Sequence, residues 1–340
     1  MKAIRIVPGA AGGTLAIQDI PTPVAGPGQV LVRVMASGLN RGEINLVRNA
    51  RSGNATTAGI EFAGVVAGVG AGVQNVREGD RVMGHGGGGQ AEYVVADARA
   101  IMPVPPALSW VEAAAFPNVF ITAHDALVTN GEFRASEAVL VNAASSGIGL
   151  AAIQIAAQMG AGKVLATSRS ADKVARLKAF GVNCAIDLSR QDQREAVTEA
   201  TDGRGVDVIV DSVGGTVFEP NLKSLAVKGR LVNLGRMGSS SAQIDLTEVW
   251  LKRLKLVGVT FRTRTEEERL GCIEACARDV LPLLAAGRIQ LPVDRVYRME
   301  DVARSHAYME TNQHFGKIVL AIDGEVQREF ATGAAAATAA

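Results

Sequence analysis

The sequence predicts an α/β fold in which a β-rich first part precedes a doubly wound parallel sheet. From residue 138 to 261, strand candidates alternate with helical stretches, which is typical of a parallel sheet with helices on both faces. Before residue 120, short β-rich segments are broken by Gly and Pro. Only 4% of the residues are aromatic and 38 are glycine, a composition that suits close helix–sheet packing.

The individual elements follow from short apolar runs bounded by turn residues. In the first part we expect little helix, and strands within QVLVRVMASG (29–38), GIEFAGVVAGVG (59–70), GDRVMGHGGGGQAEYVV (79–95) and AIMPVPPAL (100–108). The parallel sheet is expected from AVLVNA (138–143), KVLAT (163–167), NCAI (183–186), VDVIVD (206–211), GRLVNLG (229–235) and LKLVGVTF (254–261). A helix at 271–287 and strands within 291–299 and 314–322 complete the expected order.

The composition narrows the classes of partner and compartment. A formal net charge of +1 gives no reason to expect nucleic acid or an anionic membrane surface as partner. No apolar stretch has the length of a membrane-spanning helix, and the N-terminus lacks the apolar region of a signal peptide. The three cysteines, Cys184, Cys272 and Cys276, argue against a secreted disulfide scaffold. We therefore expect a cytoplasmic protein.

A cluster of small residues separates the strand candidate at 138–143 from an Ala- and Ile-rich helical pattern. Ala144, Ser146 and Gly149 occupy the three small positions of a G-x-G-x-x-G-like dinucleotide fingerprint. In that motif the small residues permit a tight turn, close approach of a pyrophosphate and close helix–strand packing, and the helix N-terminus binds the phosphates. A plain tight turn is the alternative. The predicted cofactor-binding set here is Ala144, Ser145, Ser146, Gly147, Ile148 and Gly149.

The end of the next strand candidate indicates which nicotinamide cofactor is bound. An NAD site usually has Asp or Glu here for the ribose 2′-OH, whereas this chain has Ser168 and Arg169, with Lys173 further on. A hydroxyl and two cations suit a 2′-phosphate, which a carboxylate would repel. A Ser170 helix cap with solvated basic neighbours is the alternative. The pattern favours NADPH.

Motifs along almost the whole chain resemble those of the zinc-independent medium-chain dehydrogenase/reductases, in the quinone oxidoreductase-like branch. The resemblance covers residues 1 to 322 and rests on GLNRGE, GIEFAGVVAGVG, GDRVMG, QAEYVV, SWVEAAAFPNVFITAHDAL, NAASSGIGLAAIQIA, GRGVDVIVDSVGG, GRLVNLG and GKIVL. It implies a GroES-like catalytic domain (1–122, completed by 290–325), a Rossmann domain (123–289) and an active site in the cleft between them. Residues 326–340 are expected to be a low-complexity tail. The family also implies a homodimer or homotetramer, here most simply a homodimer, joined through the last Rossmann strand at about 255–260.

The resemblance also implies that no metal takes part. Where zinc-dependent relatives carry a catalytic Cys and then a His-Glu pair, this chain has Ser37 and Ile60-Glu61. Zinc requires about three or four converging ligands. Cys272 and Cys276 lie on one helical face, and buried thiols are the simpler interpretation. His85, in a glycine run, is expected to be a loop residue rather than a ligand.

Site residues are carried over from the family by position. Asn40 matches a cleft asparagine whose amide can donate to a substrate carbonyl, with a structural turn residue as the alternative. The further predicted cofactor-binding residues are Thr122, Asp211, Ser212, Val213, Gly235, Phe261, Arg262 and Lys317. A surface lysine is the alternative for Lys317, and Arg41 and Glu43 are not assigned catalytic roles. None of Tyr93, Tyr297 and Tyr308 falls where a proton donor is expected, so no general acid is assigned.

The predicted function is metal-free, NADPH-dependent reduction of quinones or of the C=C bond of α,β-unsaturated carbonyls. Without a Lewis acid, hydride transfer is easier to acceptors that spread the developing charge. Two alternatives stay open: a metal-free carbonyl reductase for activated ketones or aldehydes, and a non-catalytic NADPH-binding protein with a structural or regulatory role.

Overall fold

The computed structural model describes residues 1–331 and divides the chain into two compact units. Unit 1 comprises residues 1–118 and the chain from Leu281 onward, and unit 2 comprises Val119–Val280. The α/β fold with a GroES-like part and a parallel Rossmann sheet is confirmed. The units divide a few residues before the domain boundaries expected at 122 and 289. No helix among the described residues is long and apolar enough to cross a membrane.

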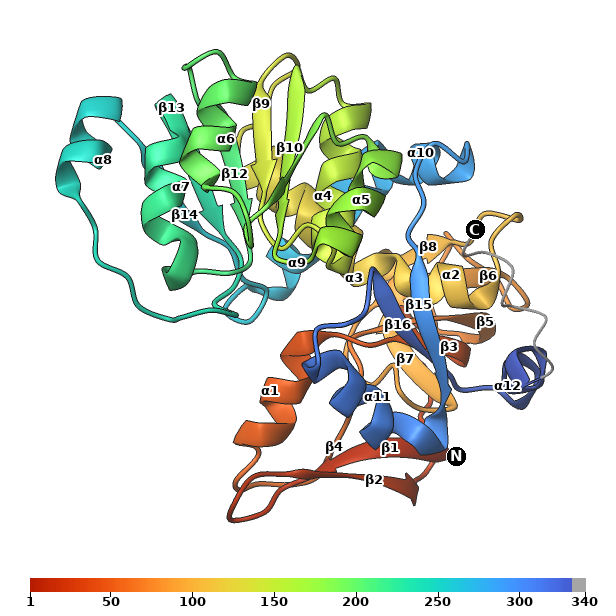
Figure 1. Cartoon of the computed structure of the whole chain (residues 1–340). Coiled ribbons are helices and arrows are strands. Elements are labelled where there is room, and N and C mark those ends of the chain that lie inside the picture. Colours follow the sequence, from red (N-terminus) through yellow and green to blue (C-terminus); the bar gives the residue numbers. More distant parts are fainter. Residues whose placement is uncertain (332–340) are drawn as a thin grey trace. The chain divides into compact units, whose positions relative to one another are not determined.

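Unit 1 is built on two antiparallel-rich sheets (Figure 1). The smaller has the order β2-β1-β4, and the larger has the order β15-β16-β3-β5-β6-β8, with β7 also paired to β3. The strands are β1 (Lys2–Val7), β2 (Thr14–Asp19), β3 (Gln29–Gly38), β4 (Thr56–Thr57), β5 (Glu61–Val69), β6 (Arg81–His85), β7 (Tyr93–Asp97), β8 (Ile101–Pro103), β15 (Val293–Arg298) and β16 (Lys317–Ala321). The late segment β16 therefore pairs directly with the early strand β3.

Unit 1 contains more helix than its sequence predicts. Its helices are α1 (Arg41–Asn49), α2 (Trp110–Ala115), α10 (Leu281–Ala285), α11 (Val302–Glu310) and α12 (Gly324–Ala331), while α3 (Pro117–His124) crosses into unit 2. Helix α1 lies beside α11 (Figure 1), and the Arg41 guanidinium of α1 donates to the Met309 carbonyl of α11 at 2.7 Å. Residues 326–331, expected to belong to the tail, are helical instead, and Val326 is fully buried. The rest of the expected tail lies outside the described residues.

Unit 2 is a parallel six-stranded sheet of order β11-β10-β9-β12-β13-β14. Its strands are β9 (Ala138–Val141), β10 (Lys163–Ser168), β11 (Cys184–Asp187), β12 (Val206–Asp211), β13 (Leu225–Asn233) and β14 (Lys255–Gly258). Its helices are α4 (Gly147–Gln158), α5 (Ala171–Leu177), α6 (Gln193–Ala200), α7 (Phe218–Ser224), α8 (Leu246–Lys252) and α9 (Glu266–Asp279), with a π-helical segment at Asp125–Asn130.

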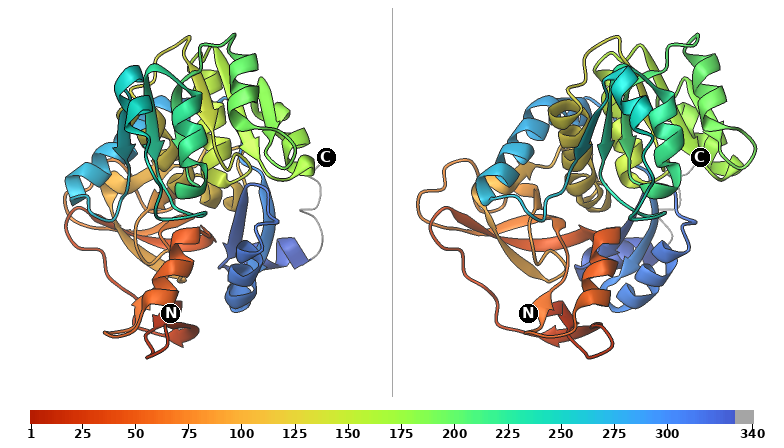
Figure 2. Two further views of the ribbon diagram at one scale, coloured as in Figure 1. Left: turned by 60° about the vertical axis from the view of Figure 1, so that its left-hand side comes forward. Right: turned by 90° about the vertical axis from the view of Figure 1, so that its left-hand side faces the viewer.

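The strand order of unit 2 indicates which edge of its sheet binds a ligand. From β9 the chain runs outward through β10 to β11, and it then returns to β12 and runs the other way to β14. Right-handed crossovers in opposite directions place helices on both faces of the sheet (Figures 1 and 2). The order reverses between β9 and β12, and ligands of such sheets bind at the carboxyl ends of the strands at this switch point. The predicted fingerprint directly follows β9.

Candidate active site

A buried polar cluster lies in unit 1 where three neighbouring strands begin or end. Strand β3 pairs with both β5 and β16, and it ends just before Asn40. Glu61 is the first residue of β5 and Lys317 is the first of β16. We call the following residues the Glu61 cluster: Asn40, Glu43, Glu61, Gln90, Asn118 and Lys317. A Cβ on Gly38 would lie 2.3 Å from Glu61 Oε1, so only glycine fits beside this carboxylate.

Lys317 is buried in the cluster rather than exposed at the surface. Its ammonium donates to Glu61 Oε1 at 2.5 Å, to the Leu39 carbonyl at 2.8 Å and to Asn40 Oδ1 at 2.9 Å. An ammonium has three donors, so all of them are used within unit 1. In this structure the three donors of Lys317 bind groups of unit 1 and its charge neutralises Glu61, and the contact of Lys317 with the cofactor stays a prediction.

Asn40 is held from four sides. Its Nδ2 donates to Glu61 Oε1 at 2.8 Å and to Glu43 Oε1 at 3.2 Å. Its Oδ1 accepts from Lys317 and, at 2.8 Å, from Asn118 Nδ2. Because an ammonium can only donate, these partners fix which end of the amide is oxygen. Both amide hydrogens already face carboxylates, and the bond to Glu43 is the longer of the two.

Glu43 is the second buried carboxyl of the cluster and differs from Glu61 in its partners. Its Oε2 accepts from Gln90 Nε2 at 2.6 Å and its Oε1 accepts from Asn40, so both neighbours are neutral amides. Burial, the largest cause, raises the pKa of Glu43 from 4.5 to about 7. Gln90 Oε1 is buried and has no hydrogen-bond partner among the described residues. No role was predicted for Glu43, because its position close to Asn40 in the sequence was the only signal.

Two other residues near the cluster have structural contacts. Arg41 binds the Met309 carbonyl and, at 2.6 Å, Asn312 Oδ1, so it joins α1 to the end of α11. His85 ends strand β6 rather than lying in a loop, and its Nε2 lies 3.2 Å from Asn118 Oδ1. The expectation of a loop position for His85 is therefore wrong, because its backbone pairs with Glu61 across β5 and β6.

In unit 2, the fingerprint residues form the turn that the sequence predicts. Ser146 is the N-cap of α4, and its hydroxyl oxygen accepts from the Gly149 N–H at 3.1 Å. A Cβ on Gly149 would lie 2.6 Å from the Ala143 carbonyl oxygen and 2.7 Å from that of Ala144. Glycine is thus required where the helix packs on the turn. The N–H groups of Gly147 and Ile148 lie in the first helical turn, which has no intrahelical acceptors.

The remaining fingerprint residues differ in exposure. Ala144 is fully buried, so it contributes by its small size, and its N–H donates to the Thr167 carbonyl at 3.1 Å. Ser145 and Ile148 are partly exposed. This arrangement fits a pyrophosphate at the helix N-terminus, where backbone N–H groups and the helix dipole attract anions.

The carboxyl end of β10 carries the residues predicted to distinguish the cofactors. Ser168 ends the strand and is partly exposed, and Arg169 is exposed. No carboxylate among residues 1–331 forms an ion pair with the Arg169 guanidinium. Ser170 occupies the N-cap position of α5, but its side chain makes no capping hydrogen bond. Lys173 lies in the first turn of α5 and is partly buried.

The Asp211 side chain, at the carboxyl end of β12, is hydrogen-bonded to the turn that follows the strand. Its Oδ1 accepts from the Val213 N–H at 2.8 Å and its Oδ2 accepts from the Gly214 N–H at 3.0 Å. It is fully buried, and burial is the largest cause that raises its pKa. The Asp211 oxygens thus bind the turn in this structure, and a contact of Asp211 with the cofactor stays a prediction. The partly exposed Ser212 and Val213 form the surface of that turn.

Gly235 lies next to this turn, as predicted from the strand ends. A Cβ at Gly235 would lie 2.8 Å from the Ser212 carbonyl oxygen. The Gly235 carbonyl accepts from Asn233 Nδ2 at 2.9 Å. The ends of β12 and β13 therefore meet in one layer of the sheet edge.

Asn142 is a site residue that the sequence analysis missed. It directly follows β9 and is buried, and its Nδ2 donates to Asn221 Oδ1 at 2.8 Å. Its Oδ1 accepts from the Thr167 hydroxyl at 2.7 Å. Asn142 thus joins the ends of β9 and β10 to α7 beneath the fingerprint. A polar residue at the end of an apolar strand was the available signal.

The last predicted cofactor residues are held by an ion pair within unit 2. Arg264 binds Asp125 through two contacts of 2.8 and 3.1 Å, and Asp125 is fully buried. The Arg264 guanidinium also lies 5.0 Å from the centre of the Phe261 ring. Thr122 lies one helical turn before Asp125. The Arg264–Asp125 ion pair therefore holds the segment that contains Phe261 and Arg262 near the helix that contains Thr122. Both residues were expected at the end of the last strand, but β14 ends at Gly258.

The cysteines have the environment of core residues. Cys272 and Cys276 lie on α9 and are buried, and burial raises the pKa of Cys272 to about 11 and that of Cys276 further. Within residues 1–331, no group of three or more His, Cys, Asp or Glu side chains is placed to hold a metal ion.

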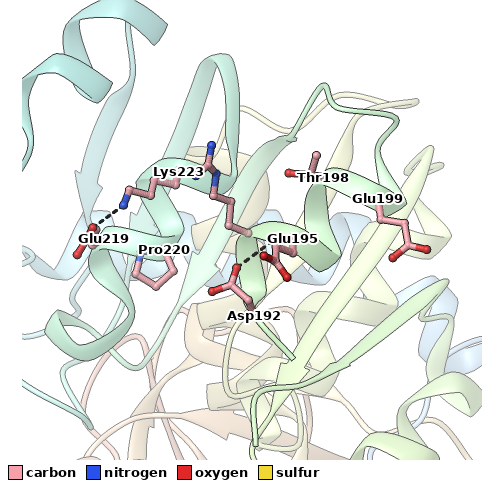
Figure 3. A pocket seen from close by; sticks show the side chains of 8 residues that line it. Asp192, Glu195, Thr198, Glu199, Glu219, Pro220 and Lys223 are labelled. Atoms are coloured by element: carbon pink, nitrogen blue, oxygen red, sulfur yellow. Dashed lines mark hydrogen bonds and ion pairs between the residues drawn. The ribbon is translucent and has the colours of Figure 1, made fainter. Parts of the chain in front are cut away.

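One surface cavity is lined by none of the predicted site residues. It is a groove between α6 and α7 with charged walls, shown in Figure 3. Glu219 and Lys223 pair at 2.6 Å on one wall, and Asp192 and Glu195 lie on the other. A smaller cavity, of about 240 Å³, lies in unit 1 and has Glu43 among its lining residues.

Comparison with known proteins identifies the class to which this fold and these sites belong. Residues 26–106 match the family model of the alcohol dehydrogenase GroES-like domain, and residues 147–275 match that of zinc-binding dehydrogenases. Quinone oxidoreductase-like protein 2 of Bos taurus is 32% identical over 313 residues, which are 91% of this chain and 89% of that protein.

Two solved structures are similar over nearly the whole chain. An NAD-dependent alcohol dehydrogenase is 30% identical, with a TM-score of 0.83 and coverage of 95% of this chain and 100% of that one. A mycobacterial protein solved as a complex with NADPH is 26% identical, with a TM-score of 0.85 and the same coverage. The chain belongs to the medium-chain dehydrogenase/reductase family, in its quinone oxidoreductase-like branch. It is an oxidoreductase that uses a nicotinamide cofactor.

Proposed function

We propose that the protein is an NADPH-dependent reductase that transfers hydride, without a metal, to quinones or to the C=C bond of α,β-unsaturated carbonyls. The observation that carries this proposal is the ion pair of Glu61 and Lys317. A buried ammonium 2.5 Å from Oε1 neutralises this carboxylate, and a metal cation bound to the same oxygen would be repelled by it.

The cofactor preference is supported at the end of β10. Arg169 is exposed and has no carboxylate partner among the described residues, so its guanidinium is available to a 2′-phosphate. Ser168 adds a hydroxyl at the same edge. The N-terminus of α4 would hold the pyrophosphate. Thr122, Phe261 and Arg262 would line the nicotinamide, and the bound cofactor supplies a hydride.

The choice of C=C over C=O follows from where charge develops. Hydride attack at the β-carbon of an enone leaves an enolate, whose charge is shared between oxygen and carbon. Attack at the carbonyl concentrates the charge on an alkoxide, which needs a Lewis acid or a strong donor beside the oxygen. Asn40 can serve an enolate oxygen by exchanging its longer bond, to Glu43, for one to the substrate.

The test is the product formed from cyclohexenone and NADPH, identified by mass and chromatography. Cyclohexanone as the main product supports the proposal, and Asn40→Ala should lower kcat/KM with little change in NADPH affinity. An allylic alcohol would favour the metal-free carbonyl reductase, and tight NADPH binding without turnover of any quinone or enone would favour the non-catalytic protein. Elemental analysis that finds about one zinc per chain, with activity lost to a chelator, would contradict the metal-free part.

We also propose a homodimer that forms through the exposed edge strand β14. The strand pairs only with β13 in the described sheet, and an unpaired edge can accept a second strand. Leu246, Trp250 and Leu251 on the preceding helix α8 are more than 60% exposed, and large exposed apolar patches mark interaction sites. A second copy paired at β14 would bury this surface.

A cytoplasmic location is part of the same proposal. The structure holds Cys184, Cys272 and Cys276 as free thiols, which suits a reducing compartment.

A further inference from the structure

The smaller cavity opens beside Glu43 and has otherwise apolar or small walls. It has a volume of about 240 Å³, near the lower end of small-molecule sites. Ile6, Leu46, Ala58 and Ile60 line it, together with Glu43, so it lies entirely within unit 1. Thr56 and Thr57 also line it. Mostly apolar pockets with a few polar groups bind small organic molecules and orient them by those groups.

The charges of the Glu61 cluster are unbalanced if both carboxyls are ionised. Glu43 and Glu61 are both almost fully buried, and Lys317 is the ammonium that binds the cluster. Lys317 contacts Glu61 directly, whereas the contacts of Glu43 are the amides of Asn40 and Gln90. Two buried carboxyls with one buried cation leave a net negative charge, and a single proton removes it.

That proton belongs on Glu43, because Glu61 is the carboxylate that the ammonium stabilises. In enzymes that use a pair of carboxyl groups, the one in the less charged environment acts as the acid and the other stays ionised. Here Glu43 corresponds to the first and Glu61 to the second. Each oxygen of Glu43 accepts one hydrogen bond and keeps a second lone pair that can carry the proton. Burial keeps the acid form populated near neutral pH, as the raised pKa of Glu43, about 7, indicates.

We propose that Glu43 is the proton donor of the reductase and that the cavity beside it binds the α-carbon side of the enone. This inference rests on the function proposed above. The reduced nicotinamide, when bound, would supply the hydride for the C–H bond at the β-carbon, and the C=C electron pair would move to give the enolate. The O–H bond of Glu43 then breaks, its proton forms the C–H bond at the α-carbon, and the enolate returns to C=O. The Glu43 carboxylate regains a proton from solvent.

The main test uses the stereochemistry of α-protonation. Wild-type protein and Glu43→Gln are compared in the reduction of 2-methylcyclohex-2-enone by NADPH in D₂O. A fixed donor delivers deuterium to one face, so the wild type should give one configuration at the α-carbon. Glu43→Gln should give a mixture, because solvent then protonates the enolate from both faces. Where protonation limits the rate, kcat should fall by about 100-fold or more.

Further measurements separate the donor role from loss of structure. Glu43→Asp keeps an acid and should restore part of the stereoselectivity, whereas NADPH affinity should be the same in all three proteins. Infrared spectroscopy should show a protonated carboxyl band in the wild type that disappears as the pH rises through about 7 and is absent from Glu43→Gln. The groups that influence this titration are the charged Lys317 and Glu61 and the amides of Asn40 and Gln90.

The outcomes distinguish this inference from the proposed function. If the wild type forms no saturated ketone, the donor role fails, and if it also reduces no quinone, the proposed function fails with it. If the wild type forms the saturated ketone and Glu43→Gln forms it with the same α-configuration and the same pH profile, the reductase stands and Glu43 is not its proton donor.

Discussion

The Lys317 ammonium nitrogen lies 2.5 Å from Oε1 of Glu61, and the two side chains are 3% and 0% exposed. They come from the first residues of β16 and β5, which both pair with β3. This contact places a buried charge pair beside the apolar core of unit 1.

Breaking this pair should destabilise the protein strongly. Lys317→Met leaves the Glu61 carboxylate buried without its cation, and such a change typically costs about 3–5 kcal/mol. Urea denaturation should show a lower free energy of unfolding for Lys317→Met. The double variant Lys317→Met/Glu61→Gln, which removes both charges, should recover part of the loss. A double variant that loses the sum of the two single losses would show that the charges are not coupled.

A side chain at the third fingerprint position should be poorly tolerated. In Gly149→Ala the new methyl group would lie 2.6–2.7 Å from two backbone carbonyl oxygens. We expect a loss of about 1–3 kcal/mol in unfolding free energy and weaker NADPH binding, because the turn must shift. Gly271→Ala is the matched control, since nothing lies within 4 Å of its Cβ and it lies within helix α9. Equal stability of the two variants would contradict the close-packing explanation.

The raised pKa of Glu43 makes stability depend on pH. Because the pKa of Glu43 is about 7 in the folded protein and ordinarily 4.5, the folded state binds this proton more tightly. The protonated Glu43 therefore contributes fully to stability below pH 4.5, and this contribution is lost as the pH rises to about 7. The loss in unfolding free energy is about 3 kcal/mol in total. Glu43→Gln lacks this loss. Its unfolding free energy relative to wild type should be higher at pH 8 than at pH 5, and parallel pH curves would refute the prediction.

We expect the Arg169 guanidinium to bind the 2′-phosphate of NADPH. Arg169→Ala should weaken NADPH binding by about tenfold, or about 1.4 kcal/mol, and leave NADH binding nearly unchanged. Fluorescence titration with each cofactor measures both constants. Arg194→Ala is the control, since Arg194 lines the groove between α6 and α7 and should alter neither constant. Equal losses for NADH and NADPH would show that Arg169 does not contact the phosphate.

The oligomeric state should depend on helix α8. Trp250 is 73% exposed, and Trp250→Glu places a charge where the proposed dimer buries an indole. Sedimentation equilibrium should show a dimer for the wild type and weaker association for Trp250→Glu, by about 2 kcal/mol or more. Val24→Glu, at a position that is 86% exposed in unit 1, should leave the association unchanged. A monomeric wild type would refute the proposed homodimer.

The regular parts of the fold were predictable because they depend on local pattern. The segment QVLVRVMASG is strand β3 over its whole length, and VDVIVD is β12. Apolar runs between Gly and Pro breakers define such strands without reference to the rest of the chain. Helix α1 was missed because RGEINLVRN is short and largely polar, and its contacts with α11 are distant in sequence.

The sequence by itself determined the family, the two-part α/β architecture and the turn at Ala144–Gly149, because small residues and alternating elements act locally. Only the tertiary structure decided the roles of Glu43, Glu61 and Lys317. The register of β3 with β5 and β16 brings residues 61 and 317 into contact, and burial then sets which carboxyl carries a charge. Pairing between distant strands and desolvation are properties of the folded chain, so no local pattern encodes them.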